Sequence, residues 1–330
     1  ASQELINILF GEETEPANLR MALVPFAAGV NVGTGFDTAW LDMAGASSIH
    51  DENFNPGVNL WTLYANLTNR DWNGCVQSRP SPYDELDTPP TPGTPDTMFV
   101  PWFAPDEPNS PSGYPNSYLS DGVTGSANVR QRSIGKYTAS VSSASKGPHR
   151  GCMNTLAITP LTNNRGLLEA QIADMTASDL THIPVGLVWG WHVISPGAPF
   201  TQGKPYDDNK NIKALVLMTD GDNTIGAEGN HNKSTYTAYG YLQEARLGTT
   251  NASTAKNILD DKTETLCENI KNANIRLYTI AFQVSSATTL NMLKSCASDE
   301  AMFFGTSDAA ALQEAFKTIA TELSNLRISK

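Results

Sequence analysis

Short apolar runs and helical patterns alternate over much of the chain. The runs Leu19–Phe26, Lys213–Thr219 and Ile275–Phe282 carry apolar residues at nearly every position. Runs of this length are typical of strands that are buried on both faces inside a parallel sheet. We therefore predict buried strands here, with Ala214–Met218 as the apolar centre of the second, and a shorter strand at Ala301–Phe304.

Apolar residues at helical spacing predict helices between these strands. The first residues resemble the second half of an amphipathic helix, so we expect the sequence to be a fragment with its natural N-terminus upstream. Alternating helices and buried strands indicate an α/β fold with a doubly wound, mostly parallel sheet. We expect helices at Asn164–Met175, Pro184–Ile194, Thr254–Asn272 and Ala287–Cys296, and a last helix that Ser307 caps. One face of the first helix carries Leu167, Leu168, Ile172 and Met175. The apolar stripe of the last helix consists of Leu312, Phe316, Ile319, Leu323 and Leu326.

The regular patterns break down between residues 34 and 151. Eleven of the twenty prolines lie between Pro80 and Pro115, which excludes long helices and central strands there. The same stretch carries Phe99, Trp102, Phe103, Tyr114 and Tyr118, which a disordered linker usually lacks. We predict an ordered, loop-rich insertion at 34–151 that interrupts one α/β domain formed by residues 1–33 and 152–330.

Net charge and apolar content exclude several classes of protein. The formal net charge is −12, whereas nucleic-acid binding and docking on anionic lipid both need a basic surface. The longest apolar stretch, Ile183–Ile194, has twelve residues and is too short to span a bilayer. The sequence also lacks GxSxG, HExxH and P-loop motifs, which disfavours common hydrolases, although a triad assembled in space would leave no such motif.

Four cysteines occur without CxxC spacing, which disfavours zinc and redox motifs. Cys267 and Cys296 lie at element ends that flank one predicted strand, so we favour their pairing, which leaves Cys75 with Cys152. Four free thiols in a cytosolic protein are the alternative. Cysteines in loops are unusual in a reducing compartment, so disulfides and a periplasmic or extracellular location are favoured.

The strand Lys213–Thr219 ends in the acidic turn Thr219-Asp-Gly-Asp-Asn223. In open α/β sheets the carboxyl ends of strands are the usual position of ligand sites. A carboxylate held at a strand end suits a hard divalent cation, which prefers oxygen ligands. A solvated turn that only ends the strand is the alternative.

A strand, a Thr-bearing loop before a helix, and a strand ending in TDG resemble, in this order, a von Willebrand factor A (vWA) domain. A longer set of segments resembles the vWA region of TadG-like proteins of the bacterial Tad (tight adherence) Flp-pilus system. These segments cover most of the chain and include MALVPFAAGVNVG, WNGCVQSRP, FVPWFAPDEP, PNSYLSDG, ITPLTNN, THIPVGLVWGWHVISP, VLMTDGDNT, LCENIKNANIRLYTIAF, LKSCAS and NLRISK.

The resemblance implies a metal-ion-dependent adhesion site at the top of the sheet. Thr181 and Asp220 match two of its three ligand motifs, and Asp222 stands beside them in a supporting position. The cofactor would be Mg²⁺, Ca²⁺ or Mn²⁺, and an acidic side chain of a protein partner would complete its coordination. The remaining motif, D-x-S-x-S, is expected upstream of this chain on a missing first strand, because the nearest candidate, Asp42–Ser48, has the wrong spacing. The resemblance also implies an N-terminal membrane anchor further upstream, as the only contact with a membrane.

Other candidate residues have plainer interpretations. We expect Thr181 to cap the following helix or to bind metal, and His182 and His192 to be surface or supporting polar groups. Trp189 and Trp191 are expected to pack in the core. Two acidic segments are expected to be surface loops, Pro105–Pro108 and Tyr206–Asn211, and the second lacks the Gly and closing Glu of an EF-hand.

The resemblance implies a non-enzymatic role in adhesion, anchoring or assembly of pilus components. A structural, self-assembling surface protein whose insertion makes the contacts is the first alternative. A metal-dependent hydrolase without a known motif is the second.

Overall fold

A parallel three-stranded sheet forms the centre of the α/β part of the molecule. The computed structural model describes residues 2–35, 37–177 and 180–328. Strand β5 (Ala214–Thr219) pairs with β6 (Arg276–Phe282), and β6 pairs on its other side with β7 (Phe303–Thr306). Thr219 lies opposite Ala281, and Ile280 lies opposite Phe304. The carboxyl ends of all three strands therefore lie at one edge of the sheet.

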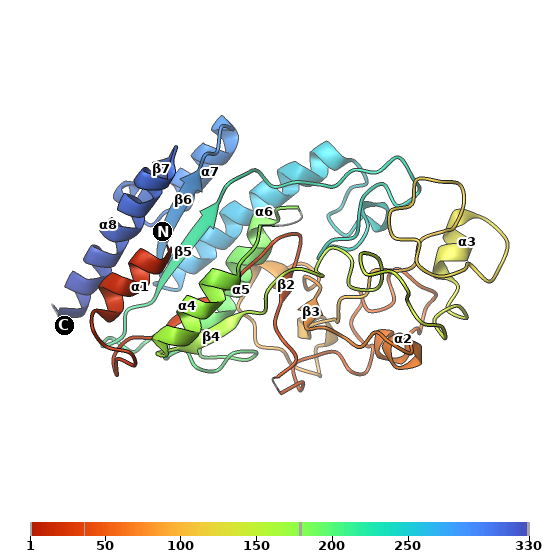
Figure 1. Ribbon diagram of the computed structural model, residues 1–330, viewed down its shortest axis with the longest axis horizontal. Coiled ribbons are helices and arrows are strands. Elements are labelled where there is room, and N and C mark those ends of the chain that lie inside the picture. Colours follow the sequence, from red (N-terminus) through yellow and green to blue (C-terminus); the bar gives the residue numbers. More distant parts are fainter. Residues whose placement is uncertain (1, 36, 178–179, 329–330) are drawn as a thin grey trace.

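Helices cover both faces of this sheet (Figure 1). The helices α1 (Ser2–Phe10) and α8 (Ala309–Ile328) pack together on one face, where Tyr278 and Ile280 of β6 join their apolar side chains. On the other face lie α5 (Ile183–Ile194), α6 (Ala252–Asn272) and α7 (Ala287–Cys296), packed on Leu277 and Ala281. Side chains alternate between the two faces of β6, so this strand contributes to the apolar packing on both faces of the sheet.

The predicted single doubly wound sheet is only partly observed. Strand β1 (Met21–Leu23) pairs antiparallel with β4 (Thr159–Thr162), which precedes helix α4 (Arg165–Asp174). Within the described ranges this pair is not hydrogen-bonded to β5, so the strands form two separate sheets. Helix α5 packs on both sheets: Gly186 lies against Phe26, just after β1, and Gly190 lies against Leu215 of β5.

The prediction that the strands within Leu19–Phe26 and Lys213–Thr219, now β1 and β5, are buried on both faces is wrong. Residues of β5 alternate between buried and more accessible positions, and Met218 is 38% exposed. Strand β1 has only three residues, all of intermediate exposure. Both strands have one edge without a strand neighbour among the described residues, which explains their incomplete burial.

The predicted helices are present with small shifts at their ends. The face proposed for α4 is only partly observed: Leu168 is buried and Ile172 packs in the same cluster, whereas Leu167 and Met175 are exposed. The start of α8 also differs: the Asp308 carboxylate, not Ser307, accepts hydrogen bonds from the backbone N–H groups of Ala310 and Ala311. No helix in the described part of the chain is long and apolar enough to cross a membrane.

The loop-rich insertion is packed around aromatic side chains, at the end of the molecule away from both termini (Figure 1). The rings of Phe54, Tyr64, Phe103 and Tyr137 make edge-to-face contacts. The short elements of this region are α2 (Leu60–Asn66), β3 (Cys75–Val76), α3 (Ala127–Arg132) and single 3₁₀ turns at Tyr83–Glu85 and Pro95–Thr97. Strand β3 pairs antiparallel with β2 (Val30–Asn31), which precedes the insertion.

The chain between β5 and α6 is part of the same packing unit, which the sequence pattern did not indicate. Its short 3₁₀ turn is Leu242–Glu244. Arg246, from this segment, bonds the Glu52 carboxylate at 2.5 Å and the Gln77 side-chain oxygen at 2.7 Å. The Ser78 N–H donates to the Ala238 carbonyl. Two segments far apart in the sequence therefore build one loop-rich region.

Both favoured disulfides are present. Cys75–Cys152 joins a cysteine within the insertion to the residue that directly follows the insertion, across 77 positions of sequence. Cys267–Cys296 joins α6 to α7. All four cysteine side chains are buried, and no described cysteine is free.

Candidate functional site

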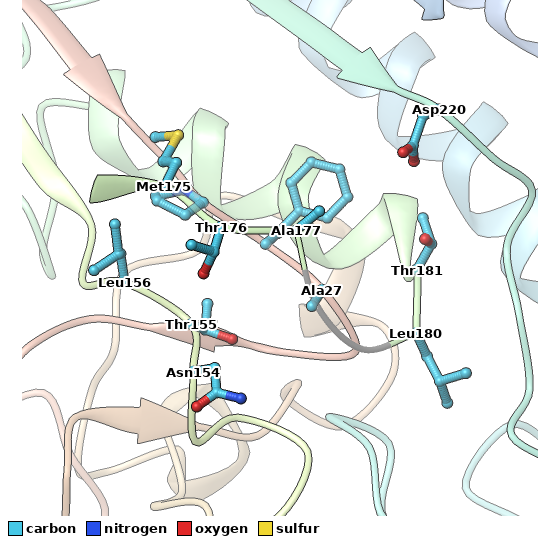
Figure 2. Close-up of a pocket in the computed structure, with 12 residues that line it drawn as sticks. Ala27, Asn154, Thr155, Leu156, Met175, Thr176, Ala177, Leu180, Thr181 and Asp220 are labelled. Carbon is cyan, nitrogen blue, oxygen red and sulfur yellow. The ribbon is translucent and has the colours of Figure 1, made fainter. Parts of the chain in front are cut away.

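Thr181 and Asp220 line one cavity between the two sheets (Figure 2). The cavity has a volume of about 180 Å³. Asp220 follows β5 directly, and Thr181 stands two residues before α5. The remaining wall comes from the chain after β1, from the end of α4 and from the approach to β4, and consists of Pro25, Phe26, Ala27, Asn154, Thr155, Leu156, Met175, Thr176, Ala177 and Leu180.

The two loops meet because hydrogen bonds join Thr181 of one loop to Thr224 of the other. The Thr224 N–H donates to the Thr181 carbonyl at 2.9 Å, and the Thr181 N–H donates to the Thr224 hydroxyl at 2.9 Å. Asn223 accepts from the Ile183 N–H at 2.8 Å, so it supplies the hydrogen bond that a capping side chain would make. Thr181 therefore does not cap α5.

Within the described residues, the Thr181 hydroxyl and the Asp220 carboxylate make no side-chain hydrogen bond, and both remain available as ligands. These two side chains supply at most three oxygens, which are too few for a divalent cation, because Mg²⁺ needs about six ligands and Ca²⁺ about six to eight. Residues 2–35, 37–177 and 180–328 contain no group of three or more His, Cys, Asp or Glu arranged to hold a metal. These residues alone do not form a complete metal site.

The Asp222 carboxylate makes its contacts outside the cavity. The Thr289 hydroxyl of α7 donates to its carboxylate at 2.6 Å, and the Lys256 ammonium of α6 lies 3.9 Å from its other oxygen. Lys256 also pairs with Asp260 at 3.0 Å. Asp222 thus links the loop after β5 to α6 and α7 and does not line the cavity.

His182 is completely buried, so the expectation of a surface group is wrong for it. Its Nε2 lies 3.1 Å from the Thr224 carbonyl, which makes it a third link between the two loops. Burial lowers the pKa of His182 to about 4. The ring is therefore neutral near pH 7, with Nε2 carrying the donated proton.

His192 is also buried, in a polar cluster that the sequence did not reveal. Its Nδ1 lies 3.3 Å from Asp87, whose carboxylate also accepts hydrogen bonds from Ser195 at 2.7 Å and Tyr206 at 2.5 Å. Ser195 donates to Asp87 and not to the imidazole, so the cluster lacks the geometry of a hydrolase triad. It fastens the Pro-rich part of the insertion to the end of α5.

The segment Pro105–Pro108 is not a surface loop as expected. Asp106 and Glu107 are buried, and the Asp106 carboxylate lies 2.7 Å from the Lys136 ammonium. Asp106 also accepts from the backbone N–H groups of Tyr118 and Leu119. The acidic pair organises the interior of the insertion.

The other sequence candidates lie away from the Thr181–Asp220 cavity. Asp42 accepts hydrogen bonds from the backbone N–H groups of Ala46 and Ser47 and from His50, which closes a local turn. The segment Tyr206–Asn211 lines a separate hollow of about 300 Å³. Trp189 and Trp191 are buried in the core, as predicted.

Comparison with solved structures returns domains of pilus and matrix proteins. The vWF domain of the type V pilus tip protein Mfa5 from Porphyromonas gingivalis aligns with 18% identity and a TM-score of 0.34, over 53% of this chain and 76% of that one. The pilus adhesin SpaC from Lactobacillus rhamnosus GG aligns with 12% identity and a TM-score of 0.36, over 53% of this chain and 23% of that one.

Proximal thread matrix protein 1 from the mussel byssus, with a zinc-occupied MIDAS motif, aligns with 15% identity and a TM-score of 0.29, over 50% of this chain and 31% of that one. No protein-family model and no curated protein matches the chain.

Proposed function

We propose that this chain is most of a non-enzymatic, vWA-type recognition domain of the Tad pilus system. It contributes to adhesion, anchoring or assembly by binding a protein partner at the Thr181–Asp220 cavity. The observation that carries the proposal is that the two residues matching the vWA motifs, 39 positions apart in sequence, line the same cavity at the end of β5.

The proposed site needs further ligands, and the arrangement of the sheets supports a source for them. Strand β5 pairs only with β6, and β1 only with β4, among the strands described. The cavity lies between the chain that follows each of these two strands. An additional strand that carries D-x-S-x-S and pairs with β5 and β1 would place its hydroxyl and carboxylate oxygens beside Thr181 and Asp220.

A Mg²⁺, Ca²⁺ or Mn²⁺ ion held by these groups would bind a carboxylate of the partner. Thr181 would supply a neutral hydroxyl ligand and Asp220 a charged one. The two buried disulfides support a periplasmic or extracellular site of action.

Intact mass and N-terminal sequencing of the natural material under denaturing conditions test the additional strand. A co-purifying or contiguous segment that carries D-x-S-x-S is the expected result. Mn²⁺ titration of that material, beside its Asp220→Ala variant, then tests the site. Equal Mn²⁺ binding by both proteins would exclude Asp220 as a ligand.

A structural role is the second candidate, because the described residues contain no group of three or more His, Cys, Asp or Glu arranged to hold a metal, and the loop-rich region is large. In that case the insertion makes the contacts and the cation is not needed. Partner capture in the presence and absence of EDTA separates the two functions, since only the metal-dependent one is lost with the chelator.

A further inference from the structure

The three residues that follow Gly221 fasten the loop of Asp220 to different parts of the fold. Asp222 is bonded to Thr289 of α7. Asn223 is bonded to both α5 and α6, and Thr224 is bonded to the Thr181 loop. The position of Asp220 therefore depends on contacts made by its neighbours.

The contacts of the Asn223 side chain require both the oxygen and the nitrogen of its carboxamide. Its side chain is completely buried. The oxygen accepts from the Ile183 N–H at 2.8 Å, and the nitrogen donates to the Asp260 carboxylate at 2.8 Å. A carboxylate at this position would keep the first bond but would face Asp260 with a like charge.

The first turn of α5 depends on this contact from outside the helix. His182 occupies the N-cap position and makes no side-chain capping bond. By contrast, α4, α6 and α7 are capped by their own Asn164, Asn251 and Ser286. Since the first N–H groups of a helix have no partner within it, Asn223 provides one for α5 from the loop of Asp220.

We propose that Asn223 is the positioning residue of the cavity and sets the separation of Thr181 from Asp220. The bond from Asn223 to Ile183 joins the loops only three residues from Asp220 and two residues from Thr181. Asp260 holds the other end of the same amide on α6. The inference deepens the proposed function, and its metal-binding part rests on that function.

Three variants test this role. Asn223→Ala removes both bonds, and Asn223→Asp places two carboxylates side by side. The double variant Asn223→Asp/Asp260→Asn exchanges donor and acceptor, so the carboxylate accepts from the Ile183 N–H and from the new amide of residue 260. We expect the double variant to regain what Asn223→Asp loses.

Amide hydrogen exchange at Ile183 reports the bond directly. Exchange at this amide should be about tenfold faster in Asn223→Ala, and close to wild type in the double variant.

A second measurement reports the distance across the cavity between residues 181 and 220. In a Thr181→Cys/Asp220→Cys background, dibromobimane fluoresces when it bridges the two thiols, and Asn223→Ala should lower the bridged fraction.

Asn164→Ala is the matched control, because it removes an asparagine cap from α4 and leaves the cavity loops untouched. It should destabilise the protein without changing exchange at Ile183 or thiol bridging. Unchanged bridging in Asn223→Ala, or no recovery in the double variant, would overturn the proposal.

Mn²⁺ titration separates this inference from the function on which it rests. Weaker Mn²⁺ binding by Asn223→Ala than by Asn164→Ala supports both. Equal binding by the two variants overturns the positioning role and leaves the metal site standing. If the wild-type protein binds no Mn²⁺, the proposed function fails, and the exchange and bridging measurements still decide the role of Asn223.

Discussion

Buried ionisable residues distinguish this protein at the residue scale. His182 and His192 are held neutral inside the fold, and burial lowers the pKa of each to about 4. The buried Lys136 ammonium lies 2.7 Å from one oxygen of the Asp106 carboxylate, and the other oxygen accepts hydrogen bonds from the backbone N–H groups of Tyr118 and Leu119. Such groups make the stability of the fold sensitive to pH and to the loss of one partner.

Stability should fall as the pH drops from about 6.5 towards 4. In this window the histidines of the unfolded chain take up protons that folded His182 and His192 do not bind, so protonation favours unfolding. Each histidine contributes on the order of 3 kcal/mol across the window. Urea unfolding at pH 7 and pH 4.5 measures the effect, and His192→Gln should reduce it. An unchanged pH dependence in both His192→Gln and His182→Gln would contradict this explanation.

Lys136→Met should destabilise the protein by about 3 to 5 kcal/mol, because it leaves the buried Asp106 carboxylate without its counter-ion. Lys146→Met is the control, since no ion pair of Lys146 is present among the described residues. Thermal unfolding of both variants checks the difference. A loss below about 1 kcal/mol for Lys136→Met would mean that the pair is dispensable.

At the element scale, α5 is central because it contacts both sheets and both cavity loops. Its glycines allow this approach: a Cβ atom at Gly186 would lie 2.4 Å from the Phe26 ring. Its N-terminus is capped by Asn223, and its far end is bound by the Asp87 cluster. The helix thus connects the candidate site to the insertion.

Gly186→Ala should cost about 1 to 3 kcal/mol, because α5 or Phe26 must move to admit the methyl group. Gly166→Ala on α4 is the matched control, since its added Cβ meets nothing closer than 3.6 Å. That variant should be neutral or more stable by up to about 1 kcal/mol, from helix propensity. Chemical unfolding of the pair tests the packing, and equal effects would contradict it.

At the scale of the whole molecule, the insertion and the segment after β5 form one region. Arg246 joins them through Glu52 and Gln77. The Cys75–Cys152 disulfide holds the insertion against the α/β part. The loop-rich region should therefore lose its structure as a unit.

Arg246→Met should increase hydrogen exchange in residues 34–151 and 226–251 together, while β5, β6 and β7 stay protected. The physical reason is that Glu52 and Gln77 lose their shared buried partner. Hydrogen-exchange mass spectrometry resolves these segments. Faster exchange confined to 240–251 would show that the two segments are not coupled.

The sequence by itself determined the local structure and the chemistry of this protein. Apolar periodicity located α5, α6, α7 and the strands β5 and β6, because period and length report which positions can be buried. Cysteine positions indicated the pairs Cys75–Cys152 and Cys267–Cys296, both of which are present. The resemblance to vWA domains selected Thr181 and Asp220.

Only the tertiary structure decided which distant groups meet. That Thr181 and Asp220 share a cavity depends on Asn223 and Thr224, whose bonds cross about forty positions of sequence. The burial of Asp106 and His192 depends on Lys136 and Asp87, which no local pattern connects to them. Periodicity describes the faces of a single element, whereas the cost of burying a charge is offset by partners that folding alone brings close.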